Sequence, residues 1–166
     1  MAAGGDAAHI AARADLSATE QSELPVLIVT GLKQEARIAA GPGLTVICSS
    51  SNPVQLREMM VSFDPASIRG IVSFGVAGGL NPSLRSGDIV VASGIVAGRQ
   101  SWATAAALTE NLVALPNGRK RKIVSGVLAG VEEVVTGQRA KAALRATTGA
   151  DAVDMESHIA ARYAEH

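Results

Sequence analysis

Short apolar runs alternate with amphipathic segments along most of this chain, and the pattern begins at Pro25. The run Val26–Thr30 is continuous and rich in β-branched residues, which is typical of a strand buried on both faces. Further on, Asn52-Pro53 offers an N-cap followed by proline at the first helical position, which favours the start of a helix. The apolar face of that helix is formed, at helical spacing, by Leu56, Met59, Met60 and Phe63.

The same pattern predicts the order of strands and helices over the rest of the chain. The predicted strands are 26–30, 44–48, 70–74, 88–97, 123–127 and 152–155. The predicted helices are 33–40, the helix from Pro53, 104–115, 137–147 and one that begins near Glu156. Strands that alternate with helices indicate a three-layer α/β/α domain. We expect one domain at residues 25–166, after a flexible or weakly helical leader at residues 1–24.

Composition narrows the class of protein. The chain has 166 residues, 48% of them apolar, which is enough for one buried core. Lys and Arg total 15, as do Asp and Glu, so the charge does not indicate a nucleic-acid partner or an anionic membrane surface. A single cysteine, Cys48, excludes an internal disulfide, and no apolar run approaches the ~20 residues that span a bilayer. We therefore expect a cytoplasmic protein without a transmembrane segment.

The glycine-rich segment 75–80 is the first candidate for chemistry. It directly follows a predicted strand, and ligands of α/β proteins collect at the carboxyl ends of strands. Glycines there allow the backbone to approach a sugar or an anion closely. The alternative is a tight turn between two strands, because an isolated glycine-rich loop is a weak signal.

The pair Met155-Glu156 is the second candidate, at the junction of a predicted strand and a predicted helix. A carboxylate there is favoured by the helix dipole, and its two oxygens can accept hydrogen bonds from two adjacent hydroxyls. This is the chemistry of a clamp on a ribose 2′,3′-diol, with Met155 as an apolar surface beneath the sugar. The alternative is a helix-terminal charge beside a core methionine.

Other reactive side chains give weaker signals. Glu35 follows the first strand and is either a site carboxylate or a solvated helix residue. His158 and His166 share the last helix without a cysteine or carboxylate at ligand spacing, so we expect no metal site. Cys48 has no catalytic pattern around it and fits a structural thiol.

Three segments together resemble the nucleoside phosphorylase/nucleosidase superfamily in order and spacing. They are 30–35, 75–80 followed by 87–91, and 152–157. The phrases at 74–82 and 153–158 look most like the hopanoid-associated phosphorylases. The resemblance implies a phosphorylase-like α/β/α fold with a central mixed sheet, and the removal of adenine from adenosylhopane. It also implies a homodimer and no cofactor, with phosphate as an optional co-substrate, and it is compatible with peripheral contact with membrane lipid.

The resemblance also implies roles for individual residues. Glu35 falls on the position of the carboxylate that activates water in the hydrolytic members, and Glu156 on that of the residue that binds the ribose diol. The substrate-binding residues implied beside them are Gly31, Val76, Ala77, Gly78 and Met155. A nearby carboxylate and a protonated leaving base would both lower the barrier to cleavage of the N-glycosidic bond.

Two departures from the family pattern leave alternatives open. Ser73 and Val76 stand where classical phosphorylases place an Arg and a Ser to hold phosphate, so water rivals phosphate as the nucleophile. The family also continues past the helix at Glu156 with one more strand and an Asp that protonates the purine. Because the sequence stops at His166, we expect an incomplete C-terminus. The alternatives are a truncated, non-catalytic nucleoside binder, a methylthioadenosine/S-adenosylhomocysteine nucleosidase-like hydrolase, and a plain α/β scaffold.

Overall fold

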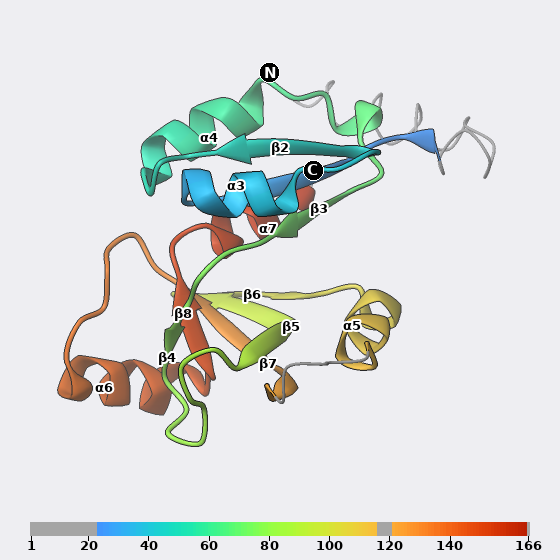
Figure 1. Ribbon diagram of the computed structural model, residues 1–166. Helices are drawn as coiled ribbons and strands as arrows, with labels where there is room; N and C mark the ends of the chain where they lie inside the picture. The colour runs from blue at the N-terminus through green and yellow to red at the C-terminus, as the bar shows by residue number, and fades with distance from the viewer. Residues whose placement is uncertain (1–22, 116–120, 166) are drawn as a thin grey trace. The chain divides into compact units, whose positions relative to one another are not determined.

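The computed structural model describes residues 23–115 and 121–165 (Figure 1). Within this part, contacts divide the chain into two compact units, one of residues 23–75 and 159–165 and the other of residues 76–115 and 121–158. Each unit has its own sheet and its own cluster of buried apolar residues. The predicted leader at residues 1–24 lies, apart from Glu23 and Leu24, outside the described residues.

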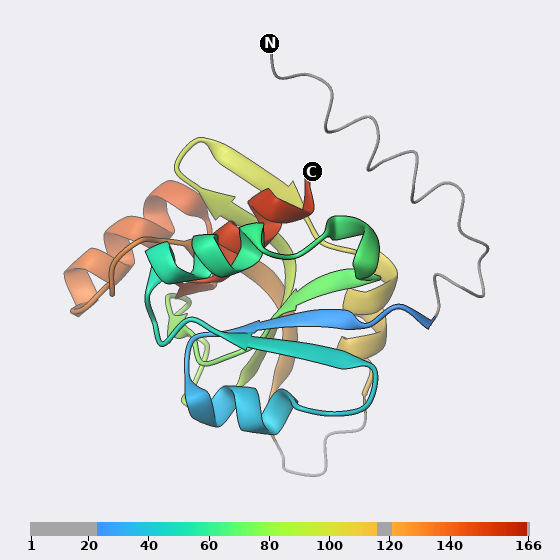
Figure 2. The ribbon, with the colours of Figure 1, turned by 90° about the horizontal axis from the view of Figure 1, so that it is seen from above.

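The first unit is built on a parallel sheet with the strand order β2-β1-β3. Its elements are β1 (Val26–Thr30), α3 (Lys33–Ala39), β2 (Leu44–Cys48), α4 (Pro53–Val61), a 3-10 turn (Pro65–Ser67), β3 (Gly70–Ser73) and the greater part of α7 (Ser157–Ala164). Helices α3 and α4 lie on opposite faces of the sheet (Figure 2). On the α4 face, Leu27 and Val29 pack with Leu56, Met60 and Ile159.

The second unit is built on a mixed sheet with the strand order β4-β8-β7-β5-β6. Its elements are β4 (Gly78–Gly79), β5 (Ile89–Ala97), β6 (Gln100–Ala103), α5 (Ala106–Val113), β7 (Ile123–Gly130), α6 (Gln138–Thr148) and β8 (Ala152–Asp154). Strand β7 runs parallel to both β5 and β8, whereas β4 and β6 pair antiparallel at the two edges. Leu144 of α6 packs on a core formed by Leu80, Ala129, Ala150 and Val153.

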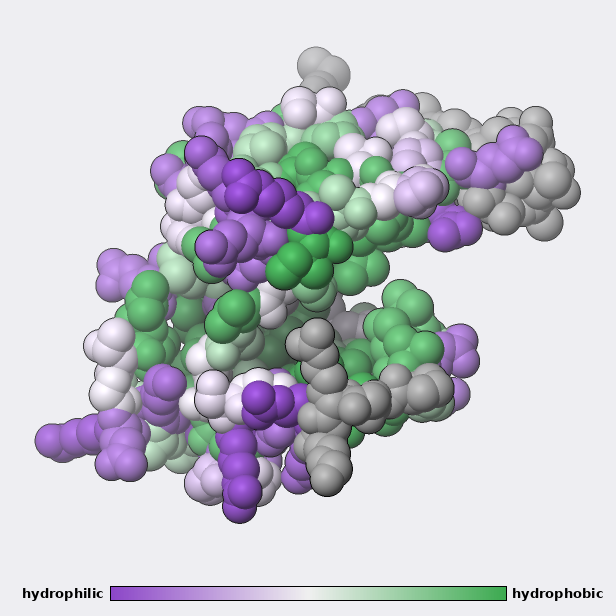
Figure 3. All heavy atoms as spheres, in the orientation of Figure 1, coloured by the Kyte–Doolittle hydropathy of each residue, from purple (hydrophilic) through white to green (hydrophobic). Residues whose placement is uncertain are grey.

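Helix α5 is attached to this sheet through hydroxyl groups. The Thr109 hydroxyl donates to the Ala92 carbonyl at 2.9 Å, and the Thr104 hydroxyl donates to the same oxygen at 2.6 Å. Ala92 adjoins a bulge in β5, where the carbonyl is available to a side-chain donor. Apolar residues gather over this helix in Figure 3, and Leu108 of α5 and Leu115 just after it are exposed.

The α/β class and the predicted alternation of strands and helices are confirmed. Asn52 caps α4 as predicted, because its side chain accepts from the N–H groups of Val54 and Gln55. Gly149 adopts a φ of 70° and ends α6, as its place after the predicted helix indicates. The strands form two sheets rather than one, and the edge strands β4 and β6 are additional to the predicted set.

Candidate active site

Glu35 is a buried carboxylate at the carboxyl end of β1. It lies in the first turn of α3 and is only 7% exposed. Its Oε2 accepts hydrogen bonds from the backbone N–H groups of Gly31, at 3.0 Å, and Leu32, at 2.8 Å. Two donors on one oxygen fix the orientation of the carboxylate. The structure thus brings Gly31 and Glu35, two residues of the predicted site, into direct contact.

Gly75, just past β3, lies against the same carboxylate. A Cβ at this position would be 2.9 Å from the Glu35 carboxyl carbon and from both of its oxygens. The approach follows from the parallel pairing of β1 with β3, which continues with the Phe74 N–H donating to the Val29 carbonyl. Only a residue without a side chain leaves space for Glu35 here. The glycine-rich pattern indicated a close approach at this point, but not that Glu35 is the group that approaches.

The next glycines of the segment belong to the second unit and lie beside β8. Gly78 pairs with Val153, and a Cβ on Gly78 would be 3.0 Å from the Val153 Cγ1 atom. Val76 and Ala77 precede this pairing, and Val76 is 80% exposed. Within this unit, therefore, Gly78 pairs with the strand that leads to Met155, and Val76 and Ala77 directly precede it in the chain.

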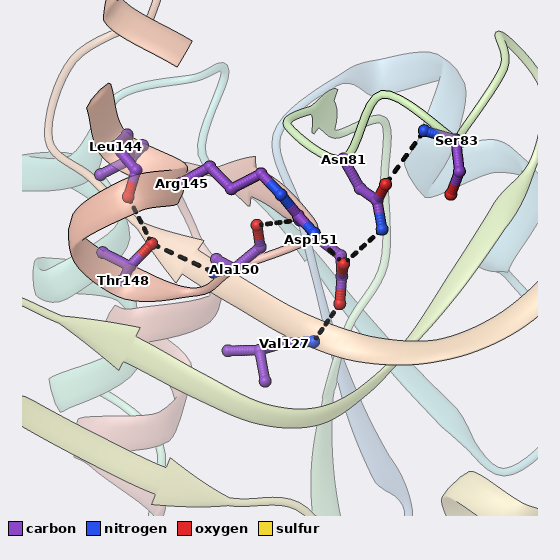
Figure 4. Close-up of polar contacts among 8 residues, drawn as sticks. All are labelled: Asn81, Ser83, Val127, Leu144, Arg145, Thr148, Ala150 and Asp151. Atoms are coloured by element: carbon purple, nitrogen blue, oxygen red, sulfur yellow. Dashed lines mark hydrogen bonds and ion pairs between the residues drawn. The ribbon is translucent and has the colours of Figure 1, made fainter. Parts of the chain in front are cut away.

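Asp151 ties the glycine-rich segment to β8 (Figure 4). Its Oδ1 accepts from the Asn81 amide at 2.8 Å and from Arg145 at 3.0 Å, and its Oδ2 accepts from the Val127 N–H at 3.2 Å. Its backbone carbonyl also accepts from the N–H groups of Leu80 and Asn81. Burial alone would raise the pKa of Asp151, but the hydrogen bonds from Arg145 and Asn81 outweigh it and the pKa is lowered.

Met155 and Glu156 form the turn between β8 and α7. Both residues are half-buried, and Glu156 Oε2 accepts from the Met155 N–H at 3.2 Å. The helix is capped by Asp154, whose carboxylate accepts from the Ser157 N–H at 3.3 Å and from the Ser157 hydroxyl. Burial raises the pKa of Asp154, and the hydrogen bonds from Ser157 oppose that rise.

His158 forms a contact that sequence spacing did not indicate. It is 3% exposed, and its Nε2 lies 3.1 Å from Oε1 of Glu132, 26 residues earlier in the chain. The ring occupies the space beside Gly130, where a Cβ would come within 2.3 Å of the His158 Cβ. The pair joins the start of α7 to the segment after β7, and only the pairing of β7 with β8 brings the two together.

The described residues contain no cluster of three or more His, Cys, Asp or Glu side chains that would hold a metal ion. Cys48 is half-buried and forms no disulfide. Among the helices of the described part, none is long and apolar enough to cross a membrane. The predicted site residues offer carboxylates and backbone donors: an oriented Glu35 in the first unit, and a turn carrying Glu156 in the second.

Several solved structures resemble this fold. The futalosine hydrolase of Helicobacter pylori superposes with a TM-score of 0.71 at 19% identity, over 87% of this chain and 79% of that one. A 5′-methylthioadenosine/S-adenosylhomocysteine nucleosidase of Colwellia psychrerythraea, in complex with adenine, gives 0.71 at 18% identity, over 85% and 76%. A mutant nucleosidase of Helicobacter pylori with 5′-methylthioadenosine in its active site gives 0.70 at 18% identity, over 86% and 79%.

At such identities these superpositions support the fold and not the reaction. A comparison with curated proteins finds no match. The sequence itself matches the phosphorylase superfamily over residues 7–166, a range that includes the Glu35, glycine-rich and Glu156 segments. Because that match extends over nearly all of the sequence and the fold agrees with it, the chain belongs to the phosphorylase superfamily.

Proposed function

We propose that this protein cleaves the N-glycosidic bond of a purine nucleoside, with Glu35 as the base that activates water. The observation that carries the proposal is the fixed carboxylate of Glu35, held by the N–H groups of Gly31 and Leu32 at the end of β1. A buried carboxylate with a fixed orientation can accept a proton from water as the water oxygen attacks the anomeric carbon. The C1′–N9 bond breaks, the bonding electrons leave with the purine, and the purine takes up a proton from solvent water while Glu35 releases its proton to solvent.

The second unit would hold the sugar. The Glu156 carboxylate has two oxygens and can accept hydrogen bonds from both hydroxyls of a ribose 2′,3′-diol. Met155, next to it, offers a polarizable apolar surface for the sugar. The backbone of Val76, Ala77 and Gly78 would line the nucleoside site, since Gly78 pairs with Val153 in the strand that ends next to Met155. The Asp151 hydrogen bonds from Leu80 and Asn81 hold the end of the glycine-rich segment beside β8.

The structural neighbours favour a purine nucleoside and a water nucleophile. Two of them are nucleosidases with adenine or 5′-methylthioadenosine bound, and the third is a futalosine hydrolase. Val76, at one of the two positions where classical phosphorylases would hold phosphate, has no polar side-chain atom. We therefore propose hydrolysis, with phosphorolysis as the alternative.

The finer proposal concerns the group on the 5′ carbon of the nucleoside. The segments 74–82 and 153–158 look most like those of hopanoid-associated phosphorylases, so we propose adenosylhopane as the substrate. The alternative is 5′-methylthioadenosine or S-adenosylhomocysteine, which are the substrates named for several neighbours of the same fold. The two differ in the size and hydrophobicity of the 5′ group, so competition between substrates distinguishes them.

Measurement of released adenine tests the proposal. The purified chain is incubated with adenosine, 5′-methylthioadenosine or an adenosylhopanoid, each with and without inorganic phosphate. We expect adenine and the free sugar in the absence of phosphate, with the highest kcat/KM for the adenosylhopanoid. Glu35→Gln should lower kcat by a factor of about 10² or more, because Gln cannot accept the proton of water. Glu156→Ala should mainly raise KM.

Glu58→Gln is the matched control, because Glu58 is an exposed carboxylate on α4 in the same unit as Glu35, and it should leave both constants unchanged. Release of adenine only when phosphate is present would replace hydrolysis with phosphorolysis. If the protein binds nucleosides but releases adenine from none of them, the proposed enzymatic activity is wrong and a nucleoside-binding function is favoured.

A further inference from the structure

The turn that follows β2 contains two consecutive serines with left-handed backbone. Ser50 has a φ of 52° and Ser51 a φ of 58°. No other non-glycine residue in the described part of the chain has a positive φ. This conformation is unfavourable for residues with a Cβ, so two in succession must be maintained by the contacts around them.

Ser51 holds one end of a peptide unit whose other end holds Glu35. The Ser51 N–H donates to the Gly31 carbonyl at 2.8 Å, and the Ser51 hydroxyl donates to the same oxygen at 3.4 Å. The N–H of the same peptide unit is that of Leu32, which donates to Glu35 Oε2 at 2.8 Å. Since a peptide unit is planar and rigid, fixing its carbonyl also fixes the direction of its N–H.

The peptide unit needs such restraint because Gly31 precedes it. A glycine leaves the backbone unusually free to rotate, and rotation here would turn the Leu32 N–H away from Glu35. The strained turn is itself fastened to β1, since the Ser49 N–H donates to the Thr30 carbonyl at 3.0 Å. Donors on the carbonyl also polarise the peptide unit, which strengthens the hydrogen bond from its N–H.

We propose that Ser51 is a positioning residue for Glu35, and that its left-handed backbone is retained because it directs two donors to the Gly31 carbonyl. The inference rests on the proposed role of Glu35 as the base. Ser51 acts through the peptide unit and does not itself touch the nucleoside. Its replacement should therefore change turnover more than substrate binding.

Replacement of Ser51 by glycine tests the inference. Ser51→Gly removes the hydroxyl donor and relieves the left-handed strain, so the turn becomes more mobile while the fold is retained. We expect kcat to fall by about tenfold with KM within about twofold, because a small displacement of a catalytic group is costly. The melting temperature should stay the same or rise. A purely structural role predicts the opposite, in which activity and stability fall together.

Two further variants provide the controls. Ser50→Gly relieves the same kind of strain at an exposed residue that is not bonded to Gly31 in the structure, and it should leave kcat unchanged. Ser51→Asn tolerates the left-handed backbone and still carries a donor, so it should keep most of the wild-type kcat. Normal turnover by Ser51→Gly, or an equal loss in Ser50→Gly, would overturn the inference.

Hydrogen exchange gives a measurement that does not depend on turnover. The Leu32 amide should exchange about tenfold or more faster in Ser51→Gly than in the wild type, and at the wild-type rate in Ser50→Gly. Unchanged protection of Leu32 in Ser51→Gly would also overturn the inference.

Glu35→Gln separates this inference from the proposed function. If Glu35→Gln loses turnover while Ser51→Gly keeps it, only the role of Ser51 is wrong. If Glu35→Gln keeps turnover, the assignment of the base is wrong as well.

Discussion

The side chain of Glu35, on α3, lies against Gly75, just past the end of β3. It fits there because Gly75 has no Cβ. A methyl group at this position would stand 2.9 Å from the carboxylate, so Gly75→Ala must displace it or shift the backbone. We expect Gly75→Ala to lower kcat by about tenfold or more, since the displaced carboxylate would lose the hydrogen bonds from Gly31 and Leu32. Steady-state kinetics of adenine release would measure this effect.

Gly70→Ala is the matched control, at the other end of β3. Among the described residues, apart from its two chain neighbours, Gly70 has no atom within 4 Å of where a Cβ would stand, so this variant should retain kcat and KM. Equal kcat values for Gly75→Ala and Gly70→Ala would mean that the Glu35 carboxylate is not held at Gly75 in solution.

At the scale of residues, the sequence indicated Glu35 and the glycines but not their contact. Glu35 and Gly75 are far apart in the chain, and they meet only because β1 pairs in parallel with β3. The positions of Gly31 and Glu35 at the end of β1 could be anticipated from one strand and one helix. The role of Ser51 could not be anticipated, because nothing in the sequence distinguishes a serine with left-handed backbone from any other loop serine.

At the scale of elements, Asp151, which directly precedes β8, connects β7, α6 and the turn after β4 through one carboxylate. Arg145→Ala would remove a charged donor from a half-buried acceptor and also the hydrogen bond to the Ala150 carbonyl. We expect a loss of about 1–2 kcal/mol in the free energy of unfolding, with exposure of the ion pair limiting the effect. Urea denaturation would measure it.

Arg139 offers the comparison on the same helix. It is exposed, so Arg139→Ala should change the free energy of unfolding by less than about 0.5 kcal/mol. If both variants were equally destabilised, the effect would reflect helix propensity rather than the Asp151 cluster.

The strands with apolar runs were the ones that could be predicted, because burial on both faces leaves a continuous hydrophobic signal. β1 and β2 have the predicted bounds. β6 was missed because this edge strand has four residues, two of them polar, and so carries no continuous apolar run. β7 extends beyond the predicted 123–127 because its second half pairs with β8, an interaction that the local sequence does not encode.

At the scale of the whole molecule, the numbers of acidic and basic residues are equal, so the net charge is zero. The pH dependence of stability is therefore set by individual carboxylates rather than by net charge. Asp151 and Asp154, both in the second unit, act in opposite directions. The pKa of Asp151 is lowered, so its contribution is present above the unfolded value of 3.8 and is lost as the pH falls through the folded pKa. The pKa of Asp154 is raised by burial, so its contribution is present below 3.8 and is lost as the pH rises through the folded pKa.

Asparagine at each position should reveal these opposite signs. Asp154→Asn keeps an acceptor for the Ser157 N–H at the start of α7 and removes the cost of a buried charge. Near pH 7 it should therefore be more stable than the wild type, by on the order of 1 kcal/mol, and the gain should vanish as the pH falls toward 3.8. Asp151→Asn should instead be less stable near pH 7, and its deficit should persist to pH 3.8 and close only below that value. Urea denaturation of both variants across this range would measure the difference. A loss of stability in Asp154→Asn near pH 7 would mean that the ionised cap on Ser157 stabilises the fold by more than burial of its charge costs.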